Sequence, residues 1–178
     1  MNIQTLPLTD ALLIQMPNSA DDRGYFVKTF HHDSFAKLGI DFGLRESYYS
    51  LSKQDVIRGM HFQLPPHHHA KIVFCAAGAI LDVIVDLRRA SPTYGQHYAT
   101  VLSSANRLAY YIPEGFAHGF KSLEDNTLTY YLVTSVYYKE SDTGIRYDSI
   151  GFNWEVENPM VSARDMGFTT LSRFESPF

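Results

Sequence analysis

Apolar and polar residues alternate along much of this chain, in short runs that end at glycine, proline, asparagine or aspartate. The clearest run covers residues 80–87, where Leu81, Val83, Val85 and Leu87 form an apolar face opposite the mixed face of Ile80, Asp82, Ile84 and Asp86. A period of two is typical of β-strands with one buried face. About ten short strands at intervals of roughly 8–12 residues predict an all-β sandwich or barrel, most economically a jelly roll.

Further strands are predicted over residues 25–30, 46–52, 57–63, 70–76, 98–102, 107–112, 116–120 and 127–138. Pro65-Pro66 ends the run 57–63, and we expect that run to form a hairpin with 70–76 or to lie close to it. Residues 31–38 predict a short helix, which Asp33 or Ser34 can cap and Gly39 ends. Residues 1–15 alternate weakly, and residues 139–178 predict turns, short helical pieces and a tail.

The composition predicts one domain over residues 1–178, because 45% of the residues are hydrophobic and can build a core. A net charge of −4 without a basic block gives nucleic-acid binding no electrostatic support. We expect a cytoplasmic protein, since no apolar run approaches the ~18–20 residues of a membrane span and no signal peptide is visible. The single cysteine, Cys75, excludes an internal disulfide framework and fits a reducing compartment.

Candidate chemistry centres on the run 57–63 and on Lys71. Strict alternation places His61 on one face with Gly59 and Gln63, and Arg58 on the other. It also points Lys71 away from its apolar neighbours. Taken alone, His61 fits a hydrogen-bonded core histidine and Lys71 a surface lysine. Together they fit a general base beside a cation that stabilises a developing oxyanion.

Other candidates lie on separate elements. Arg23 sits at a predicted turn, where it fits either an anion site or a solvated side chain. His118 has aromatic neighbours on its own strand face, so a core or pocket-wall position is as plausible as catalysis. In the predicted strand 127–138, Tyr131 and Tyr137 share a face. An imidazole, a phenol and cations predict proton transfer at a carbon next to a carbonyl.

The alternative to such a proton-transfer enzyme is a metal-dependent cupin. Its ligands would be histidines that converge with a defined geometry. His61 lacks a second histidine two residues on, and His67-His68-His69 lies in a proline-bounded turn. The histidine spacing therefore favours a site without a metal.

Six motifs, in order from about residue 20 to residue 167, resemble the dTDP-4-dehydrorhamnose 3,5-epimerase family. They are Asp22-Arg23-Gly24-Tyr25-Phe26, Arg58-Gly59-Met60-His61-Phe62-Gln63, Asp82-Val83-Ile84-Val85-Asp86-Leu87-Arg88, Ser91-Pro92-Thr93-Tyr94-Gly95, Ile112-Pro113-Glu114-Gly115-Phe116-Ala117-His118-Gly119-Phe120 and Ser162-Ala163-Arg164-Asp165. The resemblance implies a single cupin-type jelly roll, or double-stranded β-helix, with short helical pieces near both termini. It also implies a homodimer in which the N-terminal strands help to build the partner's pocket.

The activity implied by this resemblance is cofactor-free epimerisation of a nucleotide-linked 4-keto-6-deoxy sugar at C3, C5 or both. The resemblance makes His61 the base, supported by Asp165, with Tyr131 as the acid on the opposite face and Lys71 beside the enolate. It implies a larger set of substrate contacts: Arg23, Phe26, Lys28, Glu46, Tyr48, Ser50, Arg58, His118 and Tyr137.

Lys139 replaces a proline that is frequent in the family, and three positions of the implied substrate site also depart from the family pattern. Lys28 replaces a usual Glu, Glu46 a usual Gln and Tyr48 a usual Asn. These changes alter charge and bulk in the implied nucleotide pocket. CDP- or GDP-linked sugars and epimerisation of one centre therefore remain alternatives, as does a non-catalytic sugar-binding cupin.

Overall fold

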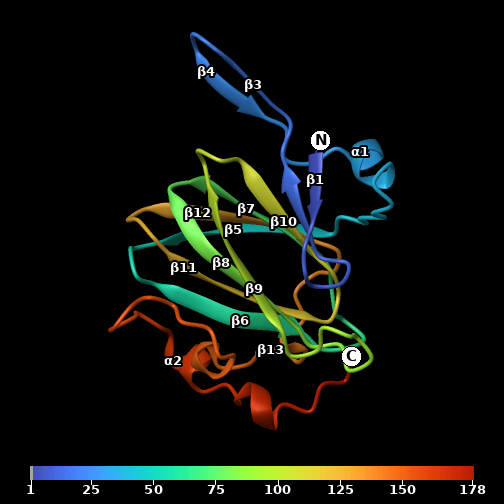
Figure 1. Ribbon diagram of the computed structural model, residues 1–178, viewed down its shortest axis with the longest axis vertical. Helices are drawn as coiled ribbons and strands as arrows, with labels where there is room; N and C mark the ends of the chain where they lie inside the picture. Colours follow the sequence, from blue (N-terminus) through green and yellow to red (C-terminus); the bar gives the residue numbers. More distant parts are fainter. Residues whose placement is uncertain (1) are drawn as a thin grey trace.

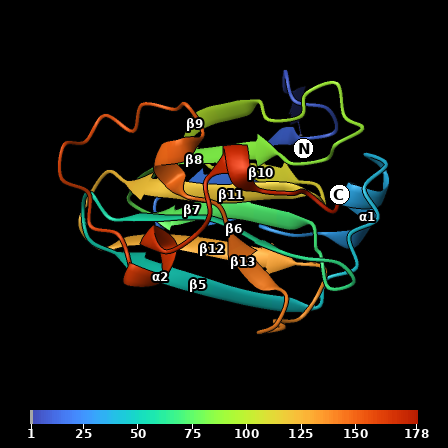
Figure 2. The same ribbon diagram turned by 90° about the horizontal axis from the view of Figure 1, so that it is seen from below.

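Two antiparallel sheets packed face to face dominate the computed structural model, which describes residues 2–178 (Figures 1 and 2). Residue 1, where the predicted domain begins, lies outside the described residues. The first sheet has the order β1 (Asn2–Thr5), β2 (Leu12–Gln15), β10 (Leu108–Ile112), β7 (Lys71–Ala77), β12 (Thr127–Val133) and β5 (Glu46–Ser52). The second has the order β13 (Asp142–Gly144), β6 (Ile57–Gln63), β11 (Phe116–Ser122), β8 (Ala79–Asp86) and β9 (His97–Ser103). The predicted all-β jelly roll is confirmed.

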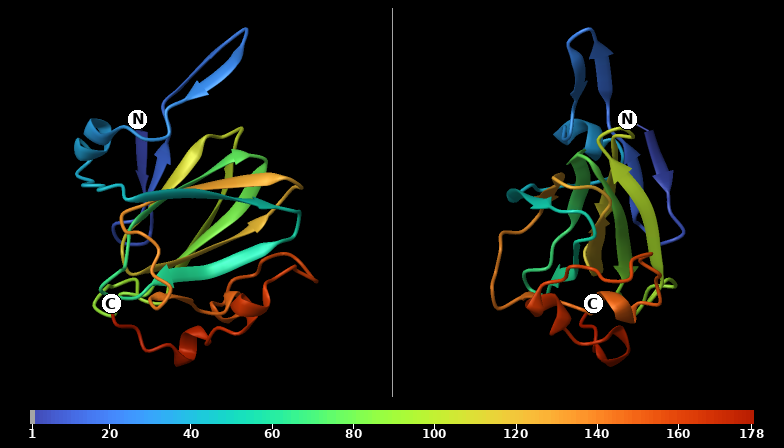
Figure 3. Two further views of the ribbon diagram at one scale, coloured as in Figure 1. Left: turned by 180° about the vertical axis from the view of Figure 1, so that it is seen from behind. Right: turned by 90° about the vertical axis from the view of Figure 1, so that its left-hand side faces the viewer.

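A separate hairpin of β3 (Asn18–Asp21) and β4 (Gly24–Val27) projects from the sheets, as both views in Figure 3 show. The predicted strand 25–30 was too long, because β4 pairs only with β3 and ends where that pairing ends. The helix α1 (His32–Ala36) follows, shorter than predicted. Its N-cap is His31, without a side-chain capping hydrogen bond, so the predicted caps Asp33 and Ser34 were wrong.

Apolar side chains fill three regions. The space between the sheets holds Val73, Ile80, Ile84, Tyr110 and Phe120, among others. Residues 27–44 cover the outer face of the first sheet, where Phe30, Phe35 and Phe42 pack together. The C-terminal segment covers the second sheet with Ile145, Ile150, Trp154, Phe174 and Phe178. That segment includes turns of 3₁₀ helix at Tyr147–Ser149 and Leu171–Arg173 and the helix α2 (Ala163–Met166). No helix within residues 2–178 is long and apolar enough to span a membrane.

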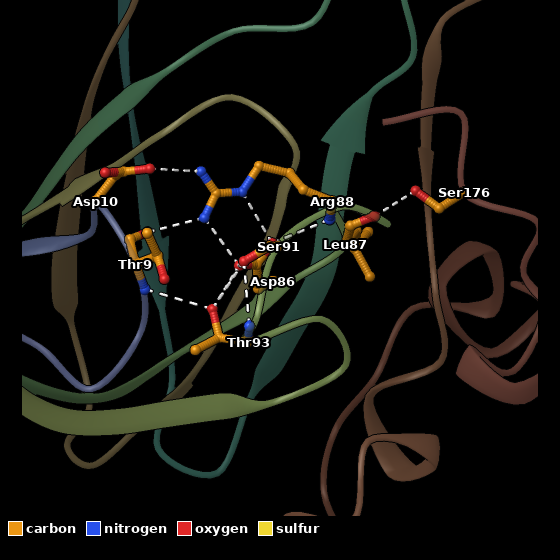
Figure 4. Close-up of polar contacts among 8 residues, drawn as sticks. All are labelled: Thr9, Asp10, Asp86, Leu87, Arg88, Ser91, Thr93 and Ser176. Atoms are coloured by element: carbon orange, nitrogen blue, oxygen red, sulfur yellow. Dashed lines mark hydrogen bonds and ion pairs between the residues drawn. The ribbon is translucent and has the colours of Figure 1, made fainter.

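A polar network at the end of β8 ties distant segments together (Figure 4). The buried Asp86 carboxylate accepts hydrogen bonds from Arg88 at 2.8 Å and from Thr93 Oγ1 at 2.7 Å. Arg88 also donates to the Thr9 carbonyl at 2.8 Å and to Asp10 at 2.9 Å. Burial opposes ionisation of Asp86, but these hydrogen bonds outweigh it, so the pKa of Asp86 lies below its usual range. The network fixes the N-terminal loop against the strand end.

Three sequence predictions that bear on the candidate site were wrong. First, β6 does not alternate strictly: its register with β11 shifts, so that His61 pairs with His118 and Arg58 with Phe120. Second, β6 and β7 lie in opposite sheets and form no hairpin, so of the two expected arrangements only the close approach holds, through the hydrogen bond from Lys71 Nζ to the His61 carbonyl at 3.1 Å. Their sheet partners come from far along the chain, which a local pattern does not reveal.

Third, β12 ends at Val133 and not at residue 138, because Val133 pairs with the first residues of both neighbouring strands, Glu46 and Lys71. Beyond Val133, neither of the two described neighbouring strands has a residue left for β12 to pair with. Tyr137 therefore lies in a loop, 60% exposed, and does not share a strand face with Tyr131.

Candidate active site

A cleft opens between β5 and β6, which come from opposite sheets. One pocket there has a volume of about 270 Å³, and its walls include Glu46, Tyr48, His61, Lys71, Tyr137 and Asp142. His61 also borders a second pocket of about 380 Å³ that Arg58, Arg164 and Asp165 line. The shift in register between β6 and β11 fits the way in which Arg58 and His61 both line this second pocket.

His61 and Asp165 form a hydrogen-bonded pair. The imidazole Nε2 lies 2.9 Å from Asp165 Oδ1, and the Gly59 N–H donates to Oδ2 at 3.1 Å. Ser162 caps α2 by accepting from the Asp165 N–H, which places the carboxylate against β6. Burial tends to raise the pKa of Asp165, but the hydrogen bonds from His61 and Gly59 outweigh it and hold that pKa below its usual range.

Lys71 places a buried positive charge next to this pair. It begins β7 and faces the space between the sheets, as the alternation predicted, with only 5% of its surface exposed. Its Nζ donates to the His61 carbonyl at 3.1 Å, which joins the two sheets across the cleft. Burial lowers the pKa of Lys71 to about 8, although the carboxylates of Asp142 and Asp82 oppose this.

Tyr131 lies on the first sheet, across the cleft from His61. Its ring stacks on that of Tyr48, with centroids 4.7 Å apart, and it meets the edge of His118 at 5.9 Å. Burial raises the pKa of the Tyr131 hydroxyl well above its usual range. His118 is itself buried and bonds Asp82 at 2.9 Å, and burial raises the pKa of Asp82 and lowers that of His118.

Several predicted contact residues also border the cleft. Arg58 donates to Ser52 Oγ at 3.1 Å and to the Leu51 carbonyl at 3.2 Å, so it bridges β6 to β5. Glu46 accepts from the Tyr137 N–H at 2.7 Å and anchors the loop after β12. Ser50 lies on β5 directly opposite Thr129.

Three predicted residues lie elsewhere in this chain. Arg23 and Phe26 are on the projecting hairpin of Figure 3, and Lys28 follows it directly. Arg23 pairs with Asp21 at 2.6 Å and is exposed, as is Phe26 at 65%. The structure does not bring these side chains into this chain's own cleft.

Sequence reasoning missed four polar side chains of the pocket: Gln63, His69, Ser135 and Asp142. Asp142 pairs with Arg164 at 2.5 Å, and no strand pattern surrounds it in the sequence. Gln63 holds the loop after β12 by donating to the Val136 carbonyl at 3.2 Å and accepting from the Tyr138 N–H at 2.7 Å. Gln63 also bonds His69, whose pKa burial lowers to about 3. The period-two relation of Gln63 to His61 could have indicated its place.

The consecutive histidines have separate partners. His67 stacks on Tyr138, His68 pairs with Glu114 at 3.1 Å, and His69 bonds Gln63. Among residues 2–178, no three His, Cys, Asp or Glu side chains come together as a metal-binding group.

A jelly roll whose cleft joins a histidine–aspartate pair, a buried lysine and stacked phenols is that of a cupin-type acid–base enzyme. The chain belongs to the dTDP-4-dehydrorhamnose 3,5-epimerase family, whose model matches residues 5–173. The predicted resemblance is confirmed. The dTDP-4-dehydrorhamnose 3,5-epimerase of Sinorhizobium fredii is 42% identical over 182 residues, which cover 100% of this chain and 93% of that protein.

Solved structures agree with this assignment. The Bacillus anthracis dTDP-4-dehydrorhamnose 3,5-epimerase with TDP and PPi bound has a TM-score of 0.93 and 34% identity, covering 96% of this chain and 99% of that one. The Legionella pneumophila dTDP-6-deoxy-D-glucose-3,5-epimerase, in complex with dTDP-4-keto-L-rhamnose, also has a TM-score of 0.93. It is 31% identical and covers 98% of this chain and 94% of that chain.

Proposed function

We propose that this chain epimerises dTDP-4-dehydro-6-deoxy-D-glucose at C3 and C5, the two carbons that flank its ketone. The observation that carries the proposal is that His61, hydrogen-bonded to Asp165, shares one pocket with the buried Lys71. Family membership and the keto-sugar complex of the Legionella relative support this substrate class. The reaction needs a base, a stabilised enolate oxygen and a proton donor on the other face of the sugar.

His61 is the base in this proposal. Asp165 is ionised and can only accept, so the shared proton sits on His61 Nε2. Nδ1 is then the basic nitrogen, free to take a proton from the carbon next to the ketone. The carboxylate stabilises the imidazolium that forms, since opposite charges at hydrogen-bond distance favour the charged form.

Lys71 stabilises the enolate oxygen. A pKa of about 8 leaves the ammonium mostly protonated at neutral pH, and its burial removes the water that would screen its charge. Tyr131, on the opposite sheet, returns a proton from the other face. Its raised pKa keeps the phenol protonated until the carbanion forms.

The remaining predicted contacts bind substrate. Arg58 at the mouth of the cleft suits a diphosphate, because a guanidinium binds phosphate oxygens in pairs. The sugar or nucleotide is held by Glu46, Tyr48 and Ser50 on β5 and by Tyr137 in the loop after β12. His118 supports Tyr131 through the contact between their rings. The cytoplasmic location, the single domain and the lack of a cofactor stay predictions.

We infer further that two chains assemble, so that Arg23, Phe26 and Lys28 reach the partner's cleft. The hairpin of β3 and β4 projects from the sheets (Figure 3) and supports this assembly, because its residues Tyr25 and Phe26 are 55% and 65% exposed. Exposed aromatic patches mark interaction surfaces. Light scattering measures the assembly, and a monomer would contradict it. Mixing Arg23→Ala with His61→Asn should restore activity only if each site takes residues from both chains.

Proton exchange in heavy water tests the reaction. The enzyme should introduce deuterium at C3 and C5 of the 4-keto sugar, as followed by NMR. His61→Asn should abolish exchange, or slow it by roughly 10²–10⁴-fold if residual bases act. Tyr131→Phe should slow inversion but still allow exchange with retention, since His61 can return its own proton. Near-normal exchange in His61→Asn would show that the base is another residue, with His118 the first to test.

A thermal-shift panel of dTDP, UDP, CDP and GDP tests the nucleotide, because a ligand stabilises the folded state by RT ln(1 + [L]/Kd). The proposal predicts the largest shift with dTDP, despite Lys28, Glu46 and Tyr48. A larger shift with another nucleotide would change the substrate and leave the reaction unchanged.

A further inference from the structure

Tyr48 lies between Tyr131 and the pocket. The two residues are directly opposite each other on β5 and β12, and their rings stack at 4.7 Å with an interplanar angle of 20°. Tyr48 lines the pocket and is 40% exposed, whereas Tyr131 is 7% exposed. Of these two stacked phenols, the one that a sugar in this pocket meets first is therefore that of Tyr48.

The surroundings of Tyr48 keep its hydroxyl protonated. Burial of the ring raises the pKa of this hydroxyl above its usual range, and the carboxylates of Glu46 and Asp142 raise it further. His61 and Lys71 line the same pocket from β6 and β7. Tyr48 thus presents a neutral O–H donor across the pocket from the candidate base.

The reaction proposed above inverts two carbons and so needs two proton deliveries on the face opposite His61. A single buried phenol would have to reach both carbons, which requires the sugar to shift between the two steps. Two stacked phenols offer two hydroxyls on that face. The geometry therefore fits a division of the two deliveries.

Resting on the proposed function, we propose that Tyr48 is a second proton donor of this site, which protonates one of the two carbons while Tyr131 protonates the other. In that step the Tyr48 O–H bond breaks and a C–H bond forms from the electron pair of the enolate double bond. The ketone is restored as the enolate oxygen loses its charge. The tyrosinate then recovers a proton from solvent, which its partial exposure allows, and the imidazolium of His61 releases one.

Tyr48→Phe is the test, with Tyr49→Phe as its matched control. Tyr49 is the next residue on β5 and also stacks on a tyrosine, Tyr130, at 6.3 Å, but it is 64% exposed on the outer face. Both replacements keep the aromatic ring and remove only the hydroxyl, so both chains should fold, as thermal melting will show. NMR in heavy water follows exchange and inversion at C3 and C5 separately.

We expect Tyr48→Phe to slow inversion at one carbon by about 10²-fold or more, while exchange with retention continues there and the other carbon inverts normally. Tyr131→Phe should affect the other carbon, and Tyr49→Phe neither. Normal inversion of both carbons in Tyr48→Phe would overturn the inference, and so would equal slowing of both, which indicates substrate binding or support of Tyr131. A wild-type enzyme that exchanges neither carbon would refute the proposed function itself, and the inference with it.

Discussion

Replacing Lys71 with Met should make the protein more stable and much less active. Lys71 is a buried ammonium with one hydrogen bond, to the His61 carbonyl. Its pKa of about 8, against the ordinary value of 10.5, shows that folding disfavours the charged form. Met has a similar length and carries no charge, so it removes this cost and keeps most of the packing.

The magnitude follows from proton linkage. Below pH 8 both folded and unfolded chains carry the proton, and the folded state bears the full cost of the buried charge. With about 1.36 kcal/mol for each pH unit between the two pKa values, that cost is roughly 3 kcal/mol at pH 7. As the pH rises from 8 toward 10.5 the folded chain loses the proton first, so the cost falls to about half by pH 9.5.

Urea denaturation at pH 7 and pH 9.5 measures this difference. The free energy of unfolding of Lys71→Met should exceed that of the wild type by roughly 3 kcal/mol at pH 7, which corresponds to about 6–12 °C in Tm. At pH 9.5 the difference should be about half as large. Turnover should fall by about 10²-fold or more, as on removal of an oxyanion donor. Lys53→Met, at an exposed turn, is the control and should change neither. A variant less stable than wild type at pH 7 would refute the reasoning.

Three further predictions follow from the contacts. Asp165→Asn should lower turnover by about 10²-fold or more, measured by steady-state kinetics, because an amide can reverse the tautomer of His61; unchanged turnover would argue against the pair. Arg88→Met should destabilise the protein by roughly 3 kcal/mol near neutral pH in urea titrations, since it leaves the buried Asp86 carboxylate without its cationic partner. The lowered pKa of Asp86 means that its stabilisation is present above pH ~4 and lost as pH falls. If Arg88→Met lost as much stability at pH 3 as near neutral pH, this reasoning would be contradicted. Gly59→Ala should destabilise the protein more than a glycine replacement in open space.

Local alternation predicted strands well where each face of the strand packs against its own layer of the protein. The run 80–87 is an example: Val83 and Val85 pack under the C-terminal segment while Ile80 and Ile84 face the space between the sheets. Alternation failed where pairing decides the outcome. Residues 134–138 keep a strand-like pattern but extend beyond the start of both neighbouring strands, so Tyr137 lies in a loop.

The candidate site shows the same division. The residue types of His61, Lys71 and Tyr131 indicated acid–base chemistry. The structure places His61 and Lys71 in the wall of one pocket and stacks the buried Tyr131 on Tyr48, which lines the same pocket. Their relative positions depend on contacts between strands whose paired residues lie more than 50 positions apart in the sequence, such as β7 with β12. The sequence pattern alone placed Lys71 on a neighbouring strand, whereas its Nζ reaches His61 from the opposite sheet.

The position of His61 depends on Gly59, and this makes Gly59→Ala informative. Gly59 has a φ of +133°, and a Cβ there would lie 2.5 Å from the Gly119 Cα. Ala at Gly151, with a φ of +73° and nothing within 4 Å, meets only the backbone cost of about 1–2 kcal/mol. Ala at Gly59 should add about 1–3 kcal/mol for the overlap and displace the N–H that holds Asp165. Equal losses of stability in the two variants, or full turnover in Gly59→Ala, would show that the close contact with β11 does not position the base.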